Sequence, residues 1–202
     1  MISIKNVAAR AIFYLAAALL LLISGCSEQK MQFKGVDITG ADYAQNFSLP
    51  DQFGNTRTIA DFKGKVAVVF FGFAQCPDVC PTAMAEFVEV KKKLGKQGDL
   101  LQPLFVTVDP ERDTGVVLKA YMGNFDPTFL ALRGDAAQTA AVAKEFKIFY
   151  KKAEGKTPSS YTLDHSAGSY TFDATGRVRI YNRYGTGAQA IADDIRQLLA
   201  AK

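Results

Sequence analysis

The chain has 202 residues and a nearly balanced charge, with 24 lysines and arginines against 20 aspartates and glutamates. This length suits one domain, and an apolar fraction of 49% leaves enough for a buried core. Basic residues do not form a stripe interleaved with aromatic residues, so the sequence gives no support for nucleic-acid binding. Three cysteines and a single histidine limit the metal sites that the chain could build.

The N-terminal segment has the organisation of a secretory signal. Lys5 and Arg10 form a basic start, and residues 11–23 are apolar apart from one tyrosine hydroxyl. This run is shorter than the roughly 20 residues that a bilayer requires, so a cleaved signal is favoured over a spanning helix. Small residues stand directly before Cys26, as in the bacterial lipobox, where cleavage leaves a lipidated cysteine at the N-terminus.

The sequence therefore predicts a lipoprotein signal over residues 1–25, Cys26 as a lipid anchor, and a tether over residues 26–44. An uncleaved N-terminal anchor is the alternative. Both alternatives place the rest of the chain outside the cytoplasm, on the periplasmic side, and attached to a membrane. Removal of the signal would lower the formal charge from +4 to about +2, because it takes away two basic residues and no acid.

Residues 45–202 are predicted to form one α/β domain. Alternation and turn-forming residues predict a hairpin over 46–59. The continuous apolar run over 66–71 predicts a strand buried on both faces. A helix over 81–94, ended near Gly95, and a second buried strand over 104–108 follow.

The second half of the domain continues this alternation. An apolar helical stripe is formed by Val116, Val117, Ala120 and Tyr121. Further elements are a helix over 136–146, a polar and exposed hairpin or loop over 151–158, a hairpin over 169–181, and a C-terminal helix. The order of strands and helices is similar to that of thioredoxin-like domains, and it predicts a central mixed sheet flanked by helices.

Cys76 and Cys80 lie at the junction between the strand over 66–71 and the following helix. Positions i and i+4 share one face of a helix, so both sulfurs would point the same way. A helix N-terminus stabilises thiolate, which is the form that binds metals and exchanges disulfides. A purely structural disulfide is the alternative, although so short a loop constrains little of the unfolded chain.

His165 is the only imidazole in the chain. The connection that carries it can come close to the cysteine helix in a thioredoxin-like sheet, so Cys76, Cys80 and His165 form a candidate metal-binding set. Thiolates select Cu(I) and imidazole suits copper, whereas structural zinc normally takes four ligands. Asp164 could orient the imidazole or cap a turn, and Asp78 could tune the thiolates, contact a partner or be merely solvated.

Two functions of different class fit these residues. The first is a metal carrier that binds and transfers its cargo without turnover. The second is a thiol–disulfide oxidoreductase that uses Cys76 and Cys80 as its redox dithiol. The cysteine spacing is one residue longer than in ordinary oxidoreductases of this fold, and no proline follows Pro158 to face the dithiol. A peroxidase is disfavoured because Phe73 stands where the threonine of a peroxiredoxin site would be.

Three segments in this order resemble the signature of the Sco (SenC-type) copper chaperones: residues 71–81, residues 108–114 and residues 164–166. The resemblance implies a thioredoxin-like fold with an extra hairpin, and Cu(I) or Cu(II) held by Cys76, Cys80 and His165. It also implies delivery of copper to the dinuclear copper centre of cytochrome c oxidase, or reduction of the cysteines there, as well as redox signalling as an alternative. The implied partners are the copper-site subunit of the oxidase and a thiol reductant or another copper carrier. Many members use a transmembrane helix, whereas this chain looks lipidated.

The acidic segment over 109–113 has two interpretations. Its residues Glu111, Arg112 and Asp113 could cap the helix that follows. Alternatively, the loop could contact a partner, because it leaves the same end of the sheet as the cysteine helix.

Overall fold

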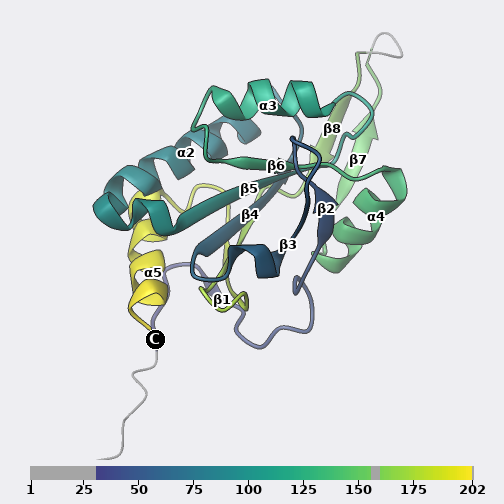
Figure 1. Ribbon diagram of the computed structural model, residues 1–202. Helices are drawn as coiled ribbons and strands as arrows, with labels where there is room; N and C mark the ends of the chain where they lie inside the picture. Colours follow the sequence, from purple (N-terminus) through teal and green to yellow (C-terminus); the bar gives the residue numbers. More distant parts are fainter. Residues whose placement is uncertain (1–30, 156–159, 202) are drawn as a thin grey trace, which may run out of the picture. The chain divides into compact units, whose positions relative to one another are not determined.

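A six-stranded mixed sheet organises residues 31–155 and 160–201, the parts of the chain that this computed structural model describes (Figure 1). The strand order is β1-β10-β9-β4-β5-β6. The bounds are Val36–Asp37 for β1, Val66–Gly72 for β4, Leu101–Thr107 for β5, Leu130–Leu132 for β6, Ser169–Phe172 for β9 and Val178–Asn182 for β10. Strands β4, β5 and β6 are parallel, while β1, β9 and β10 pair antiparallel. The predicted mixed α/β sheet is confirmed.

Strands β4 and β5 form the centre of the core. All seven residues of each strand are buried, and they pair in register from Val66 with Leu101 to Gly72 with Thr107. Their β-branched and aromatic side chains fill both faces of the sheet, as expected of central parallel strands. Cys76 lies in the loop that follows β4, and Cys80 lies in the first turn of the helix after that loop, so both are positioned by a fully buried strand.

Helices cover both faces of this sheet. On one face, Phe70 of β4 packs against Phe105 of β5, and Phe105 packs against Tyr121 of α3 (Gly115–Gly123). Helices α2 (Val79–Leu94) and α5 (Ala188–Ala200) pack together in that layer. On the other face, Phe71 packs against Phe146 at the end of α4 (Ala136–Glu145). The aromatic side chains of β4 therefore alternate between two cores. Short 3-10 helices run over Ile59–Phe62 and Gly95–Leu100.

Two hairpins stand outside the main sheet. The first, β2 (Ser48–Pro50) with β3 (Thr56–Thr58), confirms the hairpin predicted over 46–59. The second, β7 (Tyr150–Ala153) with β8 (Thr162–His165), forms where the sequence predicted a hairpin or loop before the histidine. It forms a separate two-stranded sheet.

Residues 32–44 belong to the folded unit rather than to the predicted tether. Val36 pairs with Tyr181, and the backbone amides of Lys34 and Gly35 both donate to the buried carboxylate of Asp194 at 2.8 Å. These contacts use the backbone and one distant carboxylate, so polar composition alone did not reveal them. The predicted signal over 1–25 and the lipid anchor at Cys26 lie outside the described residues.

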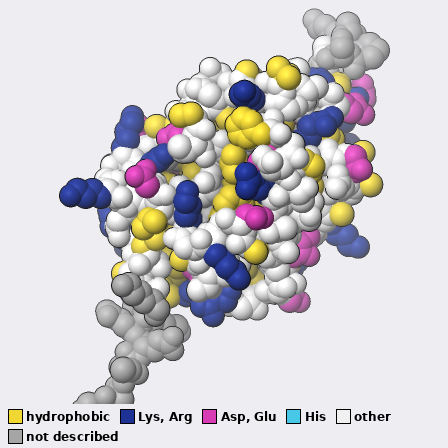
Figure 2. Space-filling model, in the orientation of Figure 1, with side chains coloured by type: hydrophobic (Ala, Val, Ile, Leu, Met, Phe, Trp, Pro, Cys, Tyr) yellow, Lys and Arg dark blue, Asp and Glu magenta, His cyan; other side chains and the backbone are white. Residues whose placement is uncertain are grey.

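Most of the predicted apolar stripe of α3 faces solvent, and of its four residues only Tyr121 packs against the sheet. Leu118 and Met122 are the buried residues of this helix, whereas Val116 is 81% exposed and Val117 is also exposed. On the face drawn in Figure 2, hydrophobic side chains reach the surface among interspersed basic and acidic ones.

Helix α3 is capped by Thr114, whose hydroxyl accepts a hydrogen bond from the amide of Val117. The prediction that residues 111–113 cap this helix is therefore wrong. No helix within the described ranges combines the length and apolarity that crossing a membrane requires.

Candidate metal centre

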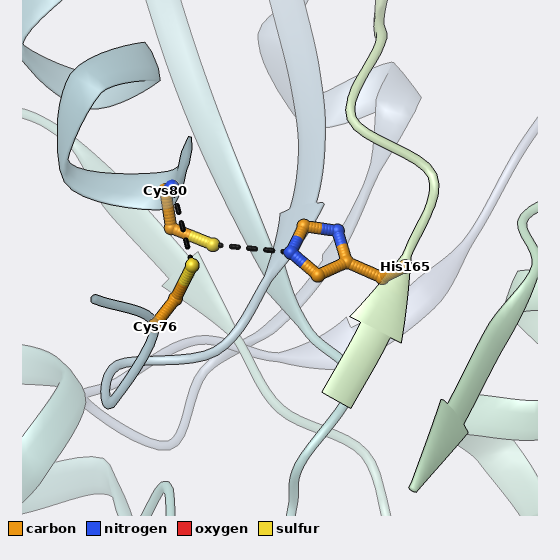
Figure 3. A group of neighbouring side chains, drawn as sticks. All are labelled: Cys76, Cys80 and His165. Carbon is orange, nitrogen blue, oxygen red and sulfur yellow. Dashed lines mark hydrogen bonds between the residues drawn. The ribbon is translucent and has the colours of Figure 1, made fainter. Parts of the chain in front are cut away.

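Three side chains from distant parts of the sequence converge at one end of the central sheet (Figure 3). Cys76 comes from the loop after β4, Cys80 from the first turn of α2, and His165 from the end of β8. The Cys80 Sγ lies 3.3 Å from the His165 Nε2. The ligand atoms of all three residues lie within 4.8 Å of one another. The structure thus brings together the three candidate ligands that the sequence predicts.

The i and i+4 spacing predicted that Cys76 and Cys80 share one face of a helix, but only Cys80 lies in the helix. Helix α2 begins at Val79 rather than near residue 81, so Cys76 precedes the helix and only Cys80 is part of it. The backbone amide of Cys80 donates to the Cys76 Sγ at 3.4 Å. Because the first amides of a helix have no partner within it, this sulfur satisfies one of them. The sulfurs converge through this contact and not through a shared helix face.

The backbone fixes the orientation of the His165 ring. Its Nδ1 lies 2.9 Å from the carbonyl oxygen of Ser166, to which it donates in the tautomer that carries the proton on Nδ1. That tautomer leaves the lone pair of Nε2 directed at Cys80, as in most metal-binding histidines. The rings of Phe70 and Phe73 meet the imidazole edge-on, at 6.1 and 5.8 Å between centroids. The imidazole is therefore held on two sides by aromatic rings.

Close packing buries Cys80 completely. A Cβ atom at Gly72 would lie 2.7 Å from its Sγ and 2.9 Å from the Phe105 ring, so only glycine permits this approach. Burial raises the pKa of the Cys80 thiol, and the hydrogen bond with Cys76 raises it further. A metal cation bound here must therefore replace a tightly held thiol proton. Cys76 is partly exposed, so one sulfur of the pair faces solvent.

The segment over residues 109–113, which follows β5, is hydrogen-bonded to the loop that carries Cys76. Asp113 is fully buried, and its Oδ2 accepts from the amide of Ala74 at 3.0 Å and from the Thr107 hydroxyl at 2.6 Å. Burial raises the pKa of the Asp113 carboxyl. The sequence suggests Asp113 only as a helix cap or as part of a partner contact, so this contact with the loop was not predicted.

Asp109 and Arg112 connect the same segment to the histidine hairpin. Asp109 forms an ion pair with Arg112 and accepts from the Tyr161 hydroxyl at 2.8 Å. Arg112 donates to the Tyr161 carbonyl at 2.9 Å, and its guanidinium lies over the Tyr161 ring at 3.6 Å. The guanidinium also lies 5.9 Å from the centre of the Phe73 ring. Residues 109–113 therefore tie both halves of the metal centre together.

The sequence suggests that Asp78 could tune the thiolates and that Asp164 could orient the imidazole, but both lie apart from the three candidate ligands. Asp78 is exposed and precedes α2 without a side-chain capping bond. Asp164 is also exposed, and it lies on the opposite face of β8 from His165 because side chains alternate along a strand. The carbonyl of Ser166 holds the imidazole in place of Asp164.

Two sulfurs and one imidazole nitrogen suit a soft metal ion in a low coordination number. Among the described residues this cluster contains no fourth histidine, cysteine or carboxylate, whereas a structural zinc site normally takes four ligands. Cys76 and Cys80 are both free thiols, so the same pair could also be oxidised to a disulfide.

The SCO1/SenC family model matches residues 36–200. The chain is 37% identical over 158 residues to the mitochondrial SCO2 homologue of Bos taurus, covering 77% of this chain and 59% of that protein. It is 39% identical over 133 residues to an SCO2-like protein of Rickettsia felis, covering 65% of each. The chain thus spans less than two thirds of the length of these curated relatives.

Solved structures agree in fold. Copper-bound ScoI from Bradyrhizobium japonicum is 38% identical with a TM-score of 0.69, covering 76% of this chain and 97% of that one. Copper-bound yeast Sco1 is 30% identical with a TM-score of 0.70, covering 78% and 88%. Apo Sco1 from Thermus thermophilus is 31% identical with a TM-score of 0.73, covering 84% and 99%. The chain belongs to the SCO1/SenC family and has its thioredoxin-like fold.

Proposed function

We propose that this protein is an extracytoplasmic copper chaperone that assists assembly of the dinuclear copper centre of cytochrome c oxidase. One observation carries the proposal: the Cys76, Cys80 and His165 ligand atoms lie within 4.8 Å of one another with the Nε2 of His165 facing Cys80. Thiolate sulfur selects Cu(I), and imidazole stabilises either copper state. The copper-bound relatives from Bradyrhizobium and yeast support copper as the metal.

Copper is cargo in this proposal, because two of the three ligands remain partly accessible. Cys76 and His165 are half-buried, while Cys80 is fully buried. A recipient's thiol or imidazole can therefore approach from the side of Cys76 and His165 while Cys80 still holds the ion. Transfer then proceeds by replacing one ligand at a time, with no need to release a free ion.

The proposed location is the periplasmic side of a membrane, with Cys26 as the lipid anchor after removal of residues 1–25. The basic start, the short apolar run and the small residues before Cys26 support it. Such an anchor would keep the protein near a membrane-embedded oxidase. The proposed partners are the oxidase subunit that carries the dinuclear copper site and a thiol reductant or another copper carrier that loads the protein.

Copper titration of the reduced protein tests the proposal. The wild type should bind one copper ion, and His165→Ala should lower the affinity for Cu(II) at least about tenfold, because even residues that only support a ligand contribute 10–100-fold. Absorption and EPR spectra report the binding. Asp164→Ala is the matched control, since it changes the neighbouring, outward-facing residue of β8 and should leave both spectra unchanged. Equal binding by His165→Ala and the wild type would exclude His165 as a ligand.

A second candidate function is reduction of the cysteines at the oxidase copper site. Its supporting observation is the pair of free thiols with their sulfurs within 4.8 Å, close enough to form a disulfide with modest movement. In that reaction one thiolate attacks a partner disulfide and the other cysteine resolves the mixed disulfide. A pure reductase should retain its rate on a disulfide peptide in the His165→Ala variant, whereas copper transfer should be lost.

A further inference from the structure

Buried polar atoms without a hydrogen-bond partner are concentrated in one stretch of the chain. Five side-chain atoms of the described residues are in this condition, and three of them belong to Arg112, Asp113 and Tyr121. Arg112 and Asp113 already hold the histidine hairpin and the cysteine loop through their other polar atoms. The hydroxyl of Tyr121, in contrast, makes no hydrogen bond. Native proteins retain few such groups, so an unpaired hydroxyl at this place calls for an explanation.

Tyr121 of α3 reaches the part of the core that surrounds Cys80. Its ring packs against the Phe105 ring, with 5.4 Å between the centroids. A Cβ atom at position 72 would meet both the Phe105 ring and the Cys80 Sγ, at 2.9 and 2.7 Å, so this ring and this sulfur lie close together. Tyr121 and Cys80 therefore share Phe105 as a neighbour on the same face of the sheet.

The phenol of Tyr121 is within electrostatic range of both sulfurs. Burial is the main cause that raises its pKa, and Cys80, Cys76 and Asp113 raise the pKa further, in that order. A raised pKa keeps the phenol protonated at physiological pH, so its O–H group is available as a donor. The residue thus offers an unpaired donor beside two thiols and a carboxyl group.

The thiol form of the centre gives this donor no strong acceptor. Neutral sulfur accepts hydrogen bonds only weakly, and the Cys80 Sγ faces the His165 Nε2. Binding of a soft cation converts Cys80 to a thiolate, and the thiol proton leaves to the solvent. Hydrogen bonds to an ionised acceptor are roughly twice as strong as neutral ones. Cys76 is partly exposed and already accepts from the amide of Cys80, so the buried sulfur is the one that lacks a donor.

We propose that Tyr121 is a positioning residue of the metal centre, and that its hydroxyl donates to the Cys80 thiolate when copper is bound. The inference rests on the proposed function and adds a group that contacts a ligand rather than the ion. Residues that hold a ligand in this way commonly contribute about 10- to 100-fold to metal affinity. Hydrogen bonds at a copper-bound cysteine sulfur also tune the electronic properties of the centre.

Asp113 is the competing acceptor for the Tyr121 hydroxyl. Its Oδ1 is buried and unpaired, while its Oδ2 is held by Ala74 and Thr107. A hydroxyl bound to Asp113 would stabilise the metal-free protein, whereas a hydroxyl that pairs only with the Cys80 thiolate would not. The two acceptors therefore lead to opposite expectations when the hydroxyl is removed.

Urea unfolding of the reduced, metal-free protein distinguishes the two acceptors. Tyr121→Phe removes the hydroxyl and keeps the ring, so it should unfold at the same or a higher urea concentration than the wild type, because no hydrogen bond is lost. A lower midpoint would overturn the inference, since it would show that the hydroxyl already has a partner such as Asp113. Tyr43→Phe is the matched control, because Tyr43 packs against Tyr170 in the aromatic cluster on the other face of the sheet.

Copper binding tests the contact itself. In competition with a chromophoric Cu(I) chelator, Tyr121→Phe should bind Cu(I) about tenfold more weakly than the wild type. In the Cu(II) form its sulfur-to-copper charge-transfer band should move to longer wavelength, because a thiolate that loses a hydrogen bond is a stronger electron donor. A merely structural role would not move this band. Tyr43→Phe should match the wild type in both measurements. Equal affinity, or an unmoved band, in Tyr121→Phe would overturn the inference.

The same measurements separate this inference from the proposed function. If the wild type and Tyr121→Phe bind copper alike, the hydroxyl has no role at the centre and the chaperone function stands. Absence of copper binding by the wild type would instead refute the chaperone function.

Discussion

The carboxylate of Asp113 accepts a hydrogen bond from the backbone amide of Ala74 at 3.0 Å, across 39 residues of sequence. Ala74 lies in the loop that carries Cys76, and Asp113 lies in the segment that leads into α3. The loop after β4 is therefore held by the segment after its neighbouring strand β5. The position of Cys76 thus depends on a residue that touches neither sulfur nor imidazole.

Replacing Asp113 with alanine should destabilise the protein and loosen the metal centre. The change leaves the Ala74 amide and the Thr107 hydroxyl without their buried partner, at an expected cost of about 1–3 kcal/mol in the free energy of unfolding. Urea denaturation measures this cost, and copper retention measures the effect on the site. Asp99→Ala, at an exposed position, is the control and should change stability by less than about 0.5 kcal/mol. Equal stability of the two variants would show that the Asp113 contact contributes nothing.

A methyl group at position 72 should displace Cys80. In Gly72→Ala the new Cβ would lie 2.7 Å from the Cys80 Sγ and 2.9 Å from Phe105, so one of them must move. Overpacking of this kind costs about 1–3 kcal/mol, and the copper spectrum should change with it. Gly123→Ala is the matched control, because no heavy atom lies within 4 Å of its Cβ position. An unchanged spectrum in Gly72→Ala would mean that the site tolerates the shift.

The anchorage of β1 should depend on Asp194. Its carboxylate accepts from the amides of Lys34 and Gly35, so Asp194→Ala should cost about 1–3 kcal/mol and expose both amides to hydrogen exchange. Asp193→Ala, which removes a half-exposed ion pair with Arg196, should cost less than about 1 kcal/mol. Unchanged exchange at Lys34 and Gly35 in Asp194→Ala would contradict this account.

Asp173 should contribute stability that is lost in acid. Burial alone would raise the pKa of its carboxyl, but hydrogen bonds from Thr175, Arg179 and Arg177 outweigh burial and hold the pKa below its usual value. A lowered pKa in the folded state means that the stabilisation is fully present above about pH 4, the unfolded pKa, and is lost as the pH falls through the folded value.

Asp173→Asn should therefore reduce stability at neutral pH and flatten the decline below about pH 4. Thermal unfolding between neutral and acidic pH measures both effects. Asp42→Asn, at an exposed position, is the control and should retain the slope of the wild type. A slope in Asp173→Asn equal to that of the wild type would exclude Asp173 as its source.

The central strand and the convergence of the three candidate ligands were predictable because each carries a local signal. Residues of β4 form a continuous apolar run that only burial on both faces explains. The ligands could be selected because the chain has one histidine and only one close pair of cysteines. Their convergence was expected from the order of strands and helices, together with the family resemblance.

Features that depend on distant backbone contacts were not predictable. Strand β1 has two exposed residues and is held by Asp194, about 160 residues away, so no local pattern marks it. In α3 the apolar Val116 and Val117 face solvent, because Leu118, Tyr121 and Met122 are the residues that pack toward the core. The His165 ring is oriented by the backbone carbonyl of Ser166. Every residue has such a carbonyl, so no sequence pattern marks this contact.

Because the β7–β8 hairpin pairs apart from the main sheet, the three candidate ligands come from two separately paired parts of the fold. Both sulfurs are attached to β4 and α2 in the core, whereas His165 belongs to a two-stranded ribbon that has no ladder with the main sheet. That ribbon is tied to the core by side chains, chiefly Arg112 and Asp109 on Tyr161. A tilt of the ribbon would therefore move the His165 imidazole relative to the two sulfurs without breaking any pairing of the main sheet. The spacing between imidazole and sulfurs is thus set by side-chain contacts rather than by a strand ladder, so single substitutions at Tyr161 or Arg112 can change it.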